Sequence, residues 1–124
     1  MDKSVPTTIY TIGMHKRAME IDAPNFQIAD LYSTWGDVNV FTTFDEGVFG
    51  VRCPINSKKV FYMWDLDWHY NGMNYDVCKE IVDKTDFLYC RCADHQTAIE
   101  KYFGRKPEIM TNFNMKELYD TKNR

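Results

Sequence analysis

The most strand-like run of this chain is Lys59-Val60-Phe61-Tyr62-Met63-Trp64. It is apolar on both faces, as expected of a central strand in a parallel sheet that is covered on both sides. Polar residues follow it at once, and this abrupt change marks the carboxyl end of a buried strand. The run therefore predicts the middle of a parallel sheet.

Downstream of this run, helical and strand patterns alternate. Asn74 is predicted to cap a helix whose apolar residues form one stripe, and Asp94 is predicted to cap a second helix that ends at Gly104. Alternation of this kind is typical of right-handed βαβ units. The expected elements are a helix at 75–84, a strand at 86–90, a helix from Asp94 to Gly104, a strand at 108–111 and a helical turn at 115–119.

Upstream of the run, the pattern is less regular. Short β-branched and aromatic stretches indicate strands, and turn residues separate them. The expected elements are a strand at 8–12, a helix at 26–34 capped by Asn25, a strand at 38–44, a turn at 45–47 and a short edge strand at 48–54.

These patterns predict an α/β fold with a single doubly wound, mostly parallel sheet of about five strands and helices on both faces, which is a Rossmann-like arrangement. A length of 124 residues corresponds to about one domain. We expect residues 1–119 to form that domain and the polar residues 120–124 to be a loose tail.

Composition narrows the class of partner. The net charge of −3 is unlike the basic surface of a nucleic-acid binder, so nucleic acid is not expected as the main ligand. The sequence has no signal peptide and no apolar run long enough to span a membrane, which predicts a soluble, cytoplasmic protein.

The four cysteines are interpreted as reduced thiols. Aromatic residues make up 15% of the chain and indicate a ring-rich core or partner surface.

The candidate catalytic residues follow the central strand directly. Asp65, Asp67 and His69 would point to one side of an extended segment, because the side-chain period of a strand is two. Ligands of open parallel sheets bind at the carboxyl ends of the strands. Two carboxylates and an imidazole suit a general base with its orienting partner, or a metal site, and they equally suit a loop whose backbone they cap.

Other candidate binding residues follow other strands. Gly13 and His15 come after the first strand, where a glycine lets a ligand approach the backbone. Arg91 ends the strand at 86–90 and is suited either to binding an anion or to pairing with Asp94. His95 is interpreted as an exposed helical residue. The sequence contains neither a dinucleotide fingerprint nor a P-loop, so no cofactor or metal is firmly implied.

Four stretches in order carry a family resemblance: VFYMWDLDWHY, YDVCKEIVDK, TDFLYCRCADHQTAIEKYFG and PEIMTNFNMKELY. From Lys58 to Tyr119 the chain resembles the closing part of the N-terminal, acceptor-side domain of GT-B-type glycosyltransferases. The resemblance implies an acceptor-side half without its nucleotide-sugar domain, which is not expected to be active alone. It would need a nucleotide sugar as donor and a second-domain partner.

The resemblance also implies roles for individual residues. Asp67 or His69 would accept the proton of an acceptor hydroxyl, and Asp65 would orient that base. A carbohydrate or other hydroxyl-bearing acceptor would be bound by Gly13, His15, Arg91 and Asn112. The D-x-D pattern also fits the other large glycosyltransferase class, in which two aspartates bind a divalent metal.

The alternative interpretation is a non-enzymatic interaction or accessory protein, for example a viral one, that retains the fold. Such a protein would use exposed rings for a partner contact or for self-association. The residues expected in that contact are Phe113, Met115, Tyr119 and Trp68.

Overall fold

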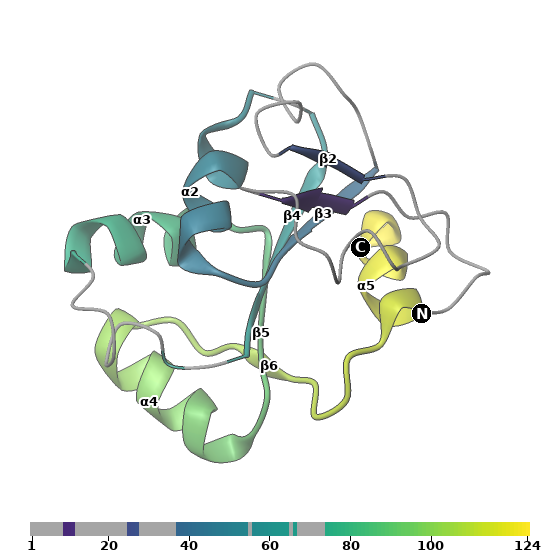
Figure 1. The fold of residues 1–124 in the computed structure, drawn as a ribbon. Helices are drawn as coiled ribbons and strands as arrows, with labels where there is room; N and C mark the ends of the chain where they lie inside the picture. The colour runs from purple at the N-terminus through teal and green to yellow at the C-terminus, as the bar shows by residue number, and fades with distance from the viewer. Residues whose placement is uncertain (1–8, 12–24, 28–36, 55, 65, 67–73) are drawn as a thin grey trace.

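The computed structural model describes residues 9–11, 25–27, 37–54, 56–64, 66 and 74–124 (Figure 1). Its main sheet has four parallel strands in the order β3 (Val38–Phe41), β4 (Lys58–Met63), β5 (Phe87–Cys90) and β6 (Glu108–Ile109). The predicted central strand is confirmed as β4, which pairs with β3 on one side and β5 on the other. Its residues from Val60 to Met63 are buried, whereas Trp64 lies beyond the strand and is exposed.

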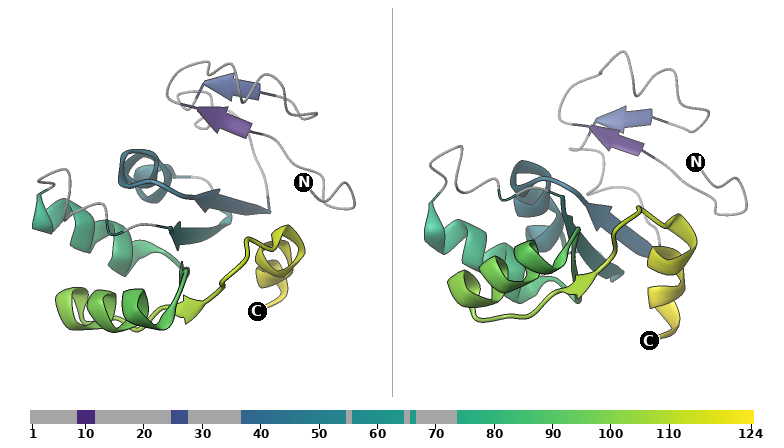
Figure 2. Two further views of the ribbon diagram at one scale, coloured as in Figure 1. Left: turned by 60° about the horizontal axis from the view of Figure 1, so that its bottom comes forward. Right: turned by 90° about the horizontal axis from the view of Figure 1, so that it is seen from below.

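Three helices connect these strands: α2 (Phe44–Arg52), α3 (Tyr75–Lys84) and α4 (Ala93–Phe103). They lie together on one side of the sheet, whereas α5 (Met115–Asp120) lies on the other (Figures 1 and 2). The strand order follows the chain order, and right-handed crossovers then place successive helices on the same face. The α/β class and the parallel sheet are confirmed. A fifth strand in this sheet, double winding and wrapping of both faces are not confirmed by the described residues.

The two faces of the sheet bury different side chains, because successive residues of a strand point to opposite sides. The face under α2, α3 and α4 has a core that includes Phe61, Met63, Leu88 and Cys90. The opposite face has a smaller core made by Val60, Tyr62, Tyr89, Met110 and, from α5, Leu118. The side chains on both faces of β4 are therefore buried, as its continuous apolar run predicts.

A separate parallel pair is formed by β1 (Ile9–Thr11) and β2 (Asn25–Gln27). β1 confirms the strand expected at 8–12. The expected helix at 26–34 is wrong at its start, because Asn25 does not cap a helix and Phe26 lies in β2. The polar–apolar–polar alternation over 25–27 has the period of a strand. The rest of that expected helix lies outside the described residues.

The largest correction concerns residues 44–52, where the end of a strand, a turn and an edge strand were expected and α2 is found. The Thr43 hydroxyl accepts a hydrogen bond from the Glu46 backbone N–H at 3.3 Å, so Thr43 is the N-cap. A Thr three residues before a Glu is the start signal of a helix. Two glycines concealed that signal. A Cβ atom added at Gly50 would lie 2.0 Å from the Phe41 ring, so only glycine lets α2 pack this closely on β3.

Of the helix ends predicted for α3 and α4, two are confirmed and one is wrong. Asn74 caps α3 as predicted, since its side-chain oxygen accepts from the backbone N–H groups of Asp76 and Val77. Gly104 ends α4 in the left-handed conformation, with φ of 77°, as predicted. The predicted Asp94 cap is wrong: Cys92 is the N-cap of α4, it makes no side-chain cap hydrogen bond, and Asp94 lies in the first turn.

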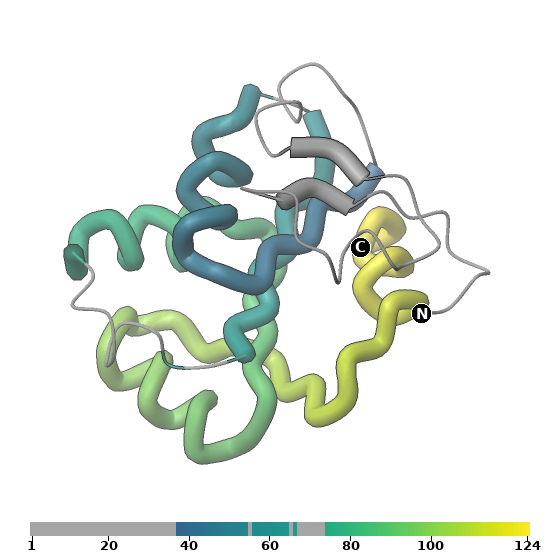
Figure 3. The backbone as a smooth tube through the Cα atoms, in the orientation of Figure 1, coloured from purple at the N-terminus to yellow at the C-terminus, as the bar shows by residue number. Residues whose placement is uncertain are grey.

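The C-terminal residues differ from the expected loose tail. After α5 the chain continues as a short 3-10 helix, η3 (Thr121–Asn123), in which Thr121 is buried. The Arg124 guanidinium forms an ion pair with Glu108 at 2.8 Å. It also makes a cation–π contact with the Phe87 ring, whose centroid lies 4.7 Å from the guanidinium carbon. The tube in Figure 3 shows this segment beside the sheet. These contacts fix the end of the chain on the face opposite α2, α3 and α4.

Candidate functional site

The predicted catalytic residues Asp65, Asp67 and His69 lie outside the described residues, as do Gly13 and His15. Their roles therefore stay predictions. Arg91 and Asn112 are described, and so is Trp64, which directly precedes Asp65. The carboxyl edge of the sheet, where the strands β4, β5 and β6 end, can be built from these residues.

Trp64 and Arg91 meet at this edge. Met63 pairs with Cys90 at the ends of β4 and β5, which places the next residue of each strand side by side. The Arg91 guanidinium carbon lies 4.8 Å from the centroid of the Trp64 ring. This distance is that of a cation–π contact. Trp64 is 43% exposed in spite of this contact.

Two further rings join Trp64. Tyr62 lies 5.9 Å from Trp64 and 5.4 Å from Phe113, which meets it edge-on. The Tyr62 hydroxyl donates to the Met110 carbonyl oxygen at 2.5 Å, which ties the chain after β6 to β4. We call Tyr62, Trp64 and Phe113 the edge ring cluster. Asn112 directly precedes Phe113 in the chain after β6. The structure therefore brings that segment and Arg91 to the same edge of the sheet.

The electrostatics of the edge follow from burial and from Arg91. Burial raises the pKa of Tyr62, and the nearby Arg91 charge opposes that rise. Burial also raises the pKa of the Cys90 thiol to about 11. A thiol with so high a pKa is protonated at neutral pH and is a poor nucleophile. All four cysteines are free, as expected, and Cys90 acts as a packing residue.

His95 differs from its interpretation as an exposed residue. It is half-buried in the first turn of α4, and its Nδ1 atom is buried without a hydrogen-bond partner among the described residues. Buried polar atoms are normally satisfied by protein, water or a ligand, because leaving them unpaired costs free energy. This burial could not be predicted from local sequence, since burial of one ring nitrogen depends on packing between elements.

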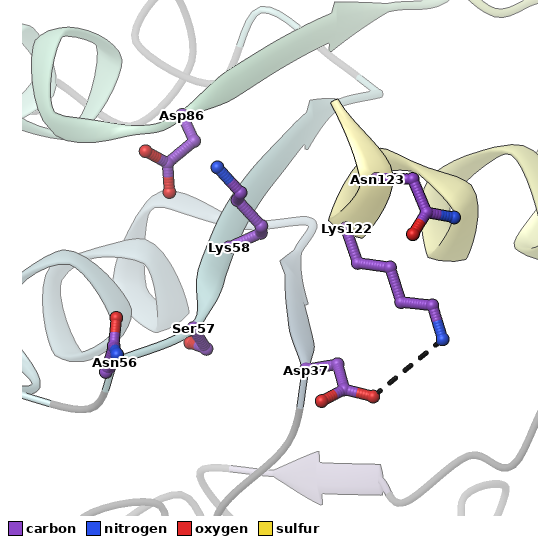
Figure 4. A pocket seen from close by; sticks show the side chains of 7 residues that line it. All are labelled: Asp37, Asn56, Ser57, Lys58, Asp86, Lys122 and Asn123. Atoms are coloured by element: carbon purple, nitrogen blue, oxygen red, sulfur yellow. Dashed lines mark ion pairs between the residues drawn. The ribbon is translucent and has the colours of Figure 1, made fainter.

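A polar pocket of about 470 Å³ lies at the opposite, amino edge of the sheet (Figure 4). It was not predicted. Its charges are paired or balanced: Lys122 lies 4.0 Å from Asp37, and the Asp86 carboxylate accepts from the Lys59 backbone N–H at 2.8 Å. Ligands of parallel sheets bind at the carboxyl edge, so we take that edge as the candidate site. The pocket is lined by Asp37, Asn56, Ser57, Lys58, Asp86, Lys122 and Asn123.

Within the described ranges, no three His, Cys, Asp or Glu side chains gather closely enough to hold a metal ion. None of the helices in that part of the chain combines the length and apolarity needed to cross a bilayer. Comparison of the chain with protein-family models, with curated proteins and with solved structures gave no match.

Proposed function

We propose that this chain is the acceptor-side domain of a GT-B-type glycosyltransferase, which binds a carbohydrate acceptor at the carboxyl edge of its sheet and acts together with a nucleotide-sugar domain. The observation that carries this proposal is the exposed Trp64 ring at the end of the central strand, with Arg91 stacked on it. That ring directly precedes the predicted catalytic residues.

The described side chains suit a sugar. An aromatic ring offers a flat apolar surface to the C–H face of a pyranose, and a few polar groups then fix the orientation. Trp64 and Phe113 supply exposed ring surface, while Arg91 and Asn112 carry the donors that sugar oxygens accept from.

The chemistry implied by the resemblance uses the residues that follow Trp64. Asp67 or His69 accepts the proton of the acceptor hydroxyl as its oxygen attacks the anomeric carbon. The bond from that carbon to the donor nucleotide breaks, and the nucleotide leaves with the electron pair. Asp65 orients the base. A positioned base contributes about two to four orders of magnitude in rate.

The order of elements in the fold supports the proposal. From β4 to α5 the structure has strand, helix, strand, helix, strand and helix, which is the order that the resemblance requires. Because one fold hosts many functions, the proposal rests on the side chains at the carboxyl edge.

The test is binding of oligosaccharides to the purified chain by calorimetry. We expect Trp64→Ala to abolish acceptor binding, and Trp64→Phe to retain part of it because a ring remains. Tyr102→Ala is the matched control, since Tyr102 is equally exposed at 45% but lies at the far end of α4. With a nucleotide-sugar domain supplied, Asp67→Asn combined with His69→Ala should abolish transfer. Oligosaccharide binding that is indifferent to Trp64 would contradict the proposal.

A second candidate function, a protein interaction module, is favoured by a separate pair of exposed rings. Tyr75 of α3 and Tyr102 of α4 are 42% and 45% exposed and meet edge-on at 5.2 Å. Aromatic side chains of this kind are enriched in protein interfaces. The same two variants separate the functions, because loss of a protein partner in Tyr102→Ala with no effect of Trp64→Ala would favour the interaction module.

A further inference from the structure

The polar pocket at the amino edge is built from the starts of three neighbouring strands (Figure 4). Asp37 directly precedes β3, Lys58 begins β4, and Asp86 directly precedes β5. The C-terminal η3 contributes Lys122 and Asn123 to the lining. The volume of about 470 Å³ lies within the range of pockets that hold small molecules.

Backbone hydrogen bonds hold these strand starts together. The Lys58 N–H donates to the Asp37 carbonyl oxygen at 3.0 Å, and the Asp86 N–H donates to the Lys59 carbonyl oxygen at 2.8 Å. In return, the Asp86 carboxylate accepts from the Lys59 N–H at 2.8 Å. The backbone of the lining is therefore fixed before a ligand arrives, which lowers the ordering cost of binding.

The chemistry of the lining defines the class of ligand. No aliphatic or aromatic residue lines the pocket, so an apolar ligand would lose hydration there without gaining apolar contacts. The two lysines and two aspartates of the lining have formal charges that cancel, and the other lining residues are neutral and polar. The pocket therefore suits a hydrophilic ligand that has no net charge.

One cation and one carboxylate oxygen in the lining are available to such a ligand. Lys122 is engaged, because its ammonium group lies 4.0 Å from Asp37 and donates to the Tyr119 hydroxyl at 2.6 Å. Lys58 is half-buried, and within the described part of the chain its ammonium group makes no ion pair or hydrogen bond. Asp86 uses Oδ2 for its backbone contact, and no group of the described residues donates to its Oδ1.

We infer that this pocket binds a small zwitterion of the α-amino acid type, whose carboxylate pairs with Lys58 and whose ammonium group pairs with Asp86. The side-chain amides of Asn56 and Asn123 carry donors and acceptors for further polar atoms of the ligand. A simple anion would be repelled by the two carboxylates, and a simple cation by the two ammonium groups. The inference goes beyond the proposed function, because this pocket lies at the edge opposite the acceptor site.

The experiment is an NMR titration of the isotope-labelled chain with L-serine, whose small polar side chain matches the lining. Two derivatives each lack one charge: N-acetyl-L-serine has no ammonium group, and L-serine amide has no carboxylate. We expect L-serine to shift the backbone amide signals of Ser57, Lys58 and Asp86. It should bind at least about 10-fold more tightly than either derivative, the usual gain from a hydrogen bond to a charged group.

Two variants test the paired charges separately. Lys58→Gln should weaken L-serine binding by at least about 10-fold, because it removes the partner of the carboxylate. Asp86→Asn keeps an oxygen for the Lys59 N–H and removes the charge, so it should weaken binding by a similar factor. Lys101→Gln is the matched control, since Lys101 is an exposed lysine of α4 outside the pocket, and it should bind L-serine normally. Circular dichroism verifies that each variant is folded.

Four results would overturn the inference. They are the absence of shifts at the pocket residues, equal affinity for L-serine and either derivative, unchanged L-serine affinity in Lys58→Gln, and tighter binding of inorganic phosphate or glycerol at the same signals. Tighter phosphate binding would identify a site for anions, and tighter glycerol binding a site for hydroxyl groups. None of these results bears on Trp64, so the proposed function stands or falls by its own test.

Discussion

The two edges of the sheet use their polar and aromatic groups differently. At the amino edge, cations satisfy the carbonyl oxygens at helix ends: Lys59 donates to Cys53 after α2 at 2.7 Å, and Arg105 donates to Thr85 after α3 at 2.7 Å. At the carboxyl edge, Trp64 and Phe113 remain 43% and 44% exposed. At the amino edge, cations therefore hold helix ends through hydrogen bonds, whereas the carboxyl edge keeps exposed aromatic surface. Substitutions should separate stability at one edge from binding at the other.

The largest loss of stability is expected from a change in the packing of α2 on β3. In Gly50→Ala the new Cβ would overlap the Phe41 ring, with a separation of 2.0 Å, so α2 must move away from β3. Overpacking of this kind typically costs about 1–3 kcal/mol, and so short a separation places this variant at the upper end of that range. Denaturant unfolding should show that loss of stability, together with loss of acceptor binding. Gly104→Ala is the control: nothing lies near its Cβ, so only backbone strain of about 1 kcal/mol is expected.

Arg105→Ala should lower stability by removing hydrogen bonds at the amino edge, and it should leave the carboxyl edge unchanged. The Arg105 guanidinium donates to the carbonyl oxygens of Val82, Thr85 and Asp86, which close the end of α3. Loss of charged hydrogen bonds to these groups should cost about 1.5–3 kcal/mol in the free energy of unfolding. Acceptor affinity should stay the same.

The control for Arg105 is Lys101→Ala, because Lys101 is an exposed cation of the same helix-to-strand region. It should change stability by about 0.5 kcal/mol or less. Equal losses in the two variants would show that the carbonyl contacts of Arg105 contribute nothing specific.

The smallest effect concerns pH at the amino edge. Hydrogen bonds from Arg52 and then Lys84 lower the pKa of Glu80 from 4.5 to about 2. Its contribution to stability is therefore complete above pH 4.5 and is lost as the pH falls from 4.5 toward 2. Glu80→Gln should flatten that part of the stability profile, which thermal melts between pH 2 and 6 would record. Salt should weaken the effect, since the pair is partly exposed. An unchanged profile in Glu80→Gln would show that Arg52 and Lys84 do not hold this carboxylate.

Local patterns predicted the elements whose signals are continuous. The run around Val60 identified β4 because a buried parallel strand is apolar on both faces, and Asn74 identified the start of α3 because its cap is local. α2 was missed because glycines at positions 47 and 50 look unfavourable until their neighbours, Ile81 and Phe41, are known. Cys92 at the start of α4 offered no capping side chain to recognise.

The candidate site was predicted only in part. The carboxyl edge follows from parallel topology, and Arg91 was selected because it ends a strand there. The edge ring cluster could not be read from sequence, because Tyr62 and Phe113 meet only when β4 and the chain after β6 lie together. Arg91 stacks on Trp64 because β4 and β5 pair in one register, and the chain between them does not encode that register locally.

The most direct test of the account compares Trp64→Ala with Arg105→Ala, measuring both oligosaccharide affinity and stability in each. We expect Trp64→Ala to abolish acceptor binding while lowering the free energy of unfolding by about 1 kcal/mol or less, since Trp64 is 43% exposed and lies beyond the end of β4. We expect the reverse for Arg105→Ala, which should bind the acceptor normally and unfold more easily. Acceptor affinity that is unchanged in Trp64→Ala would contradict the assignment of the carboxyl edge as the binding site.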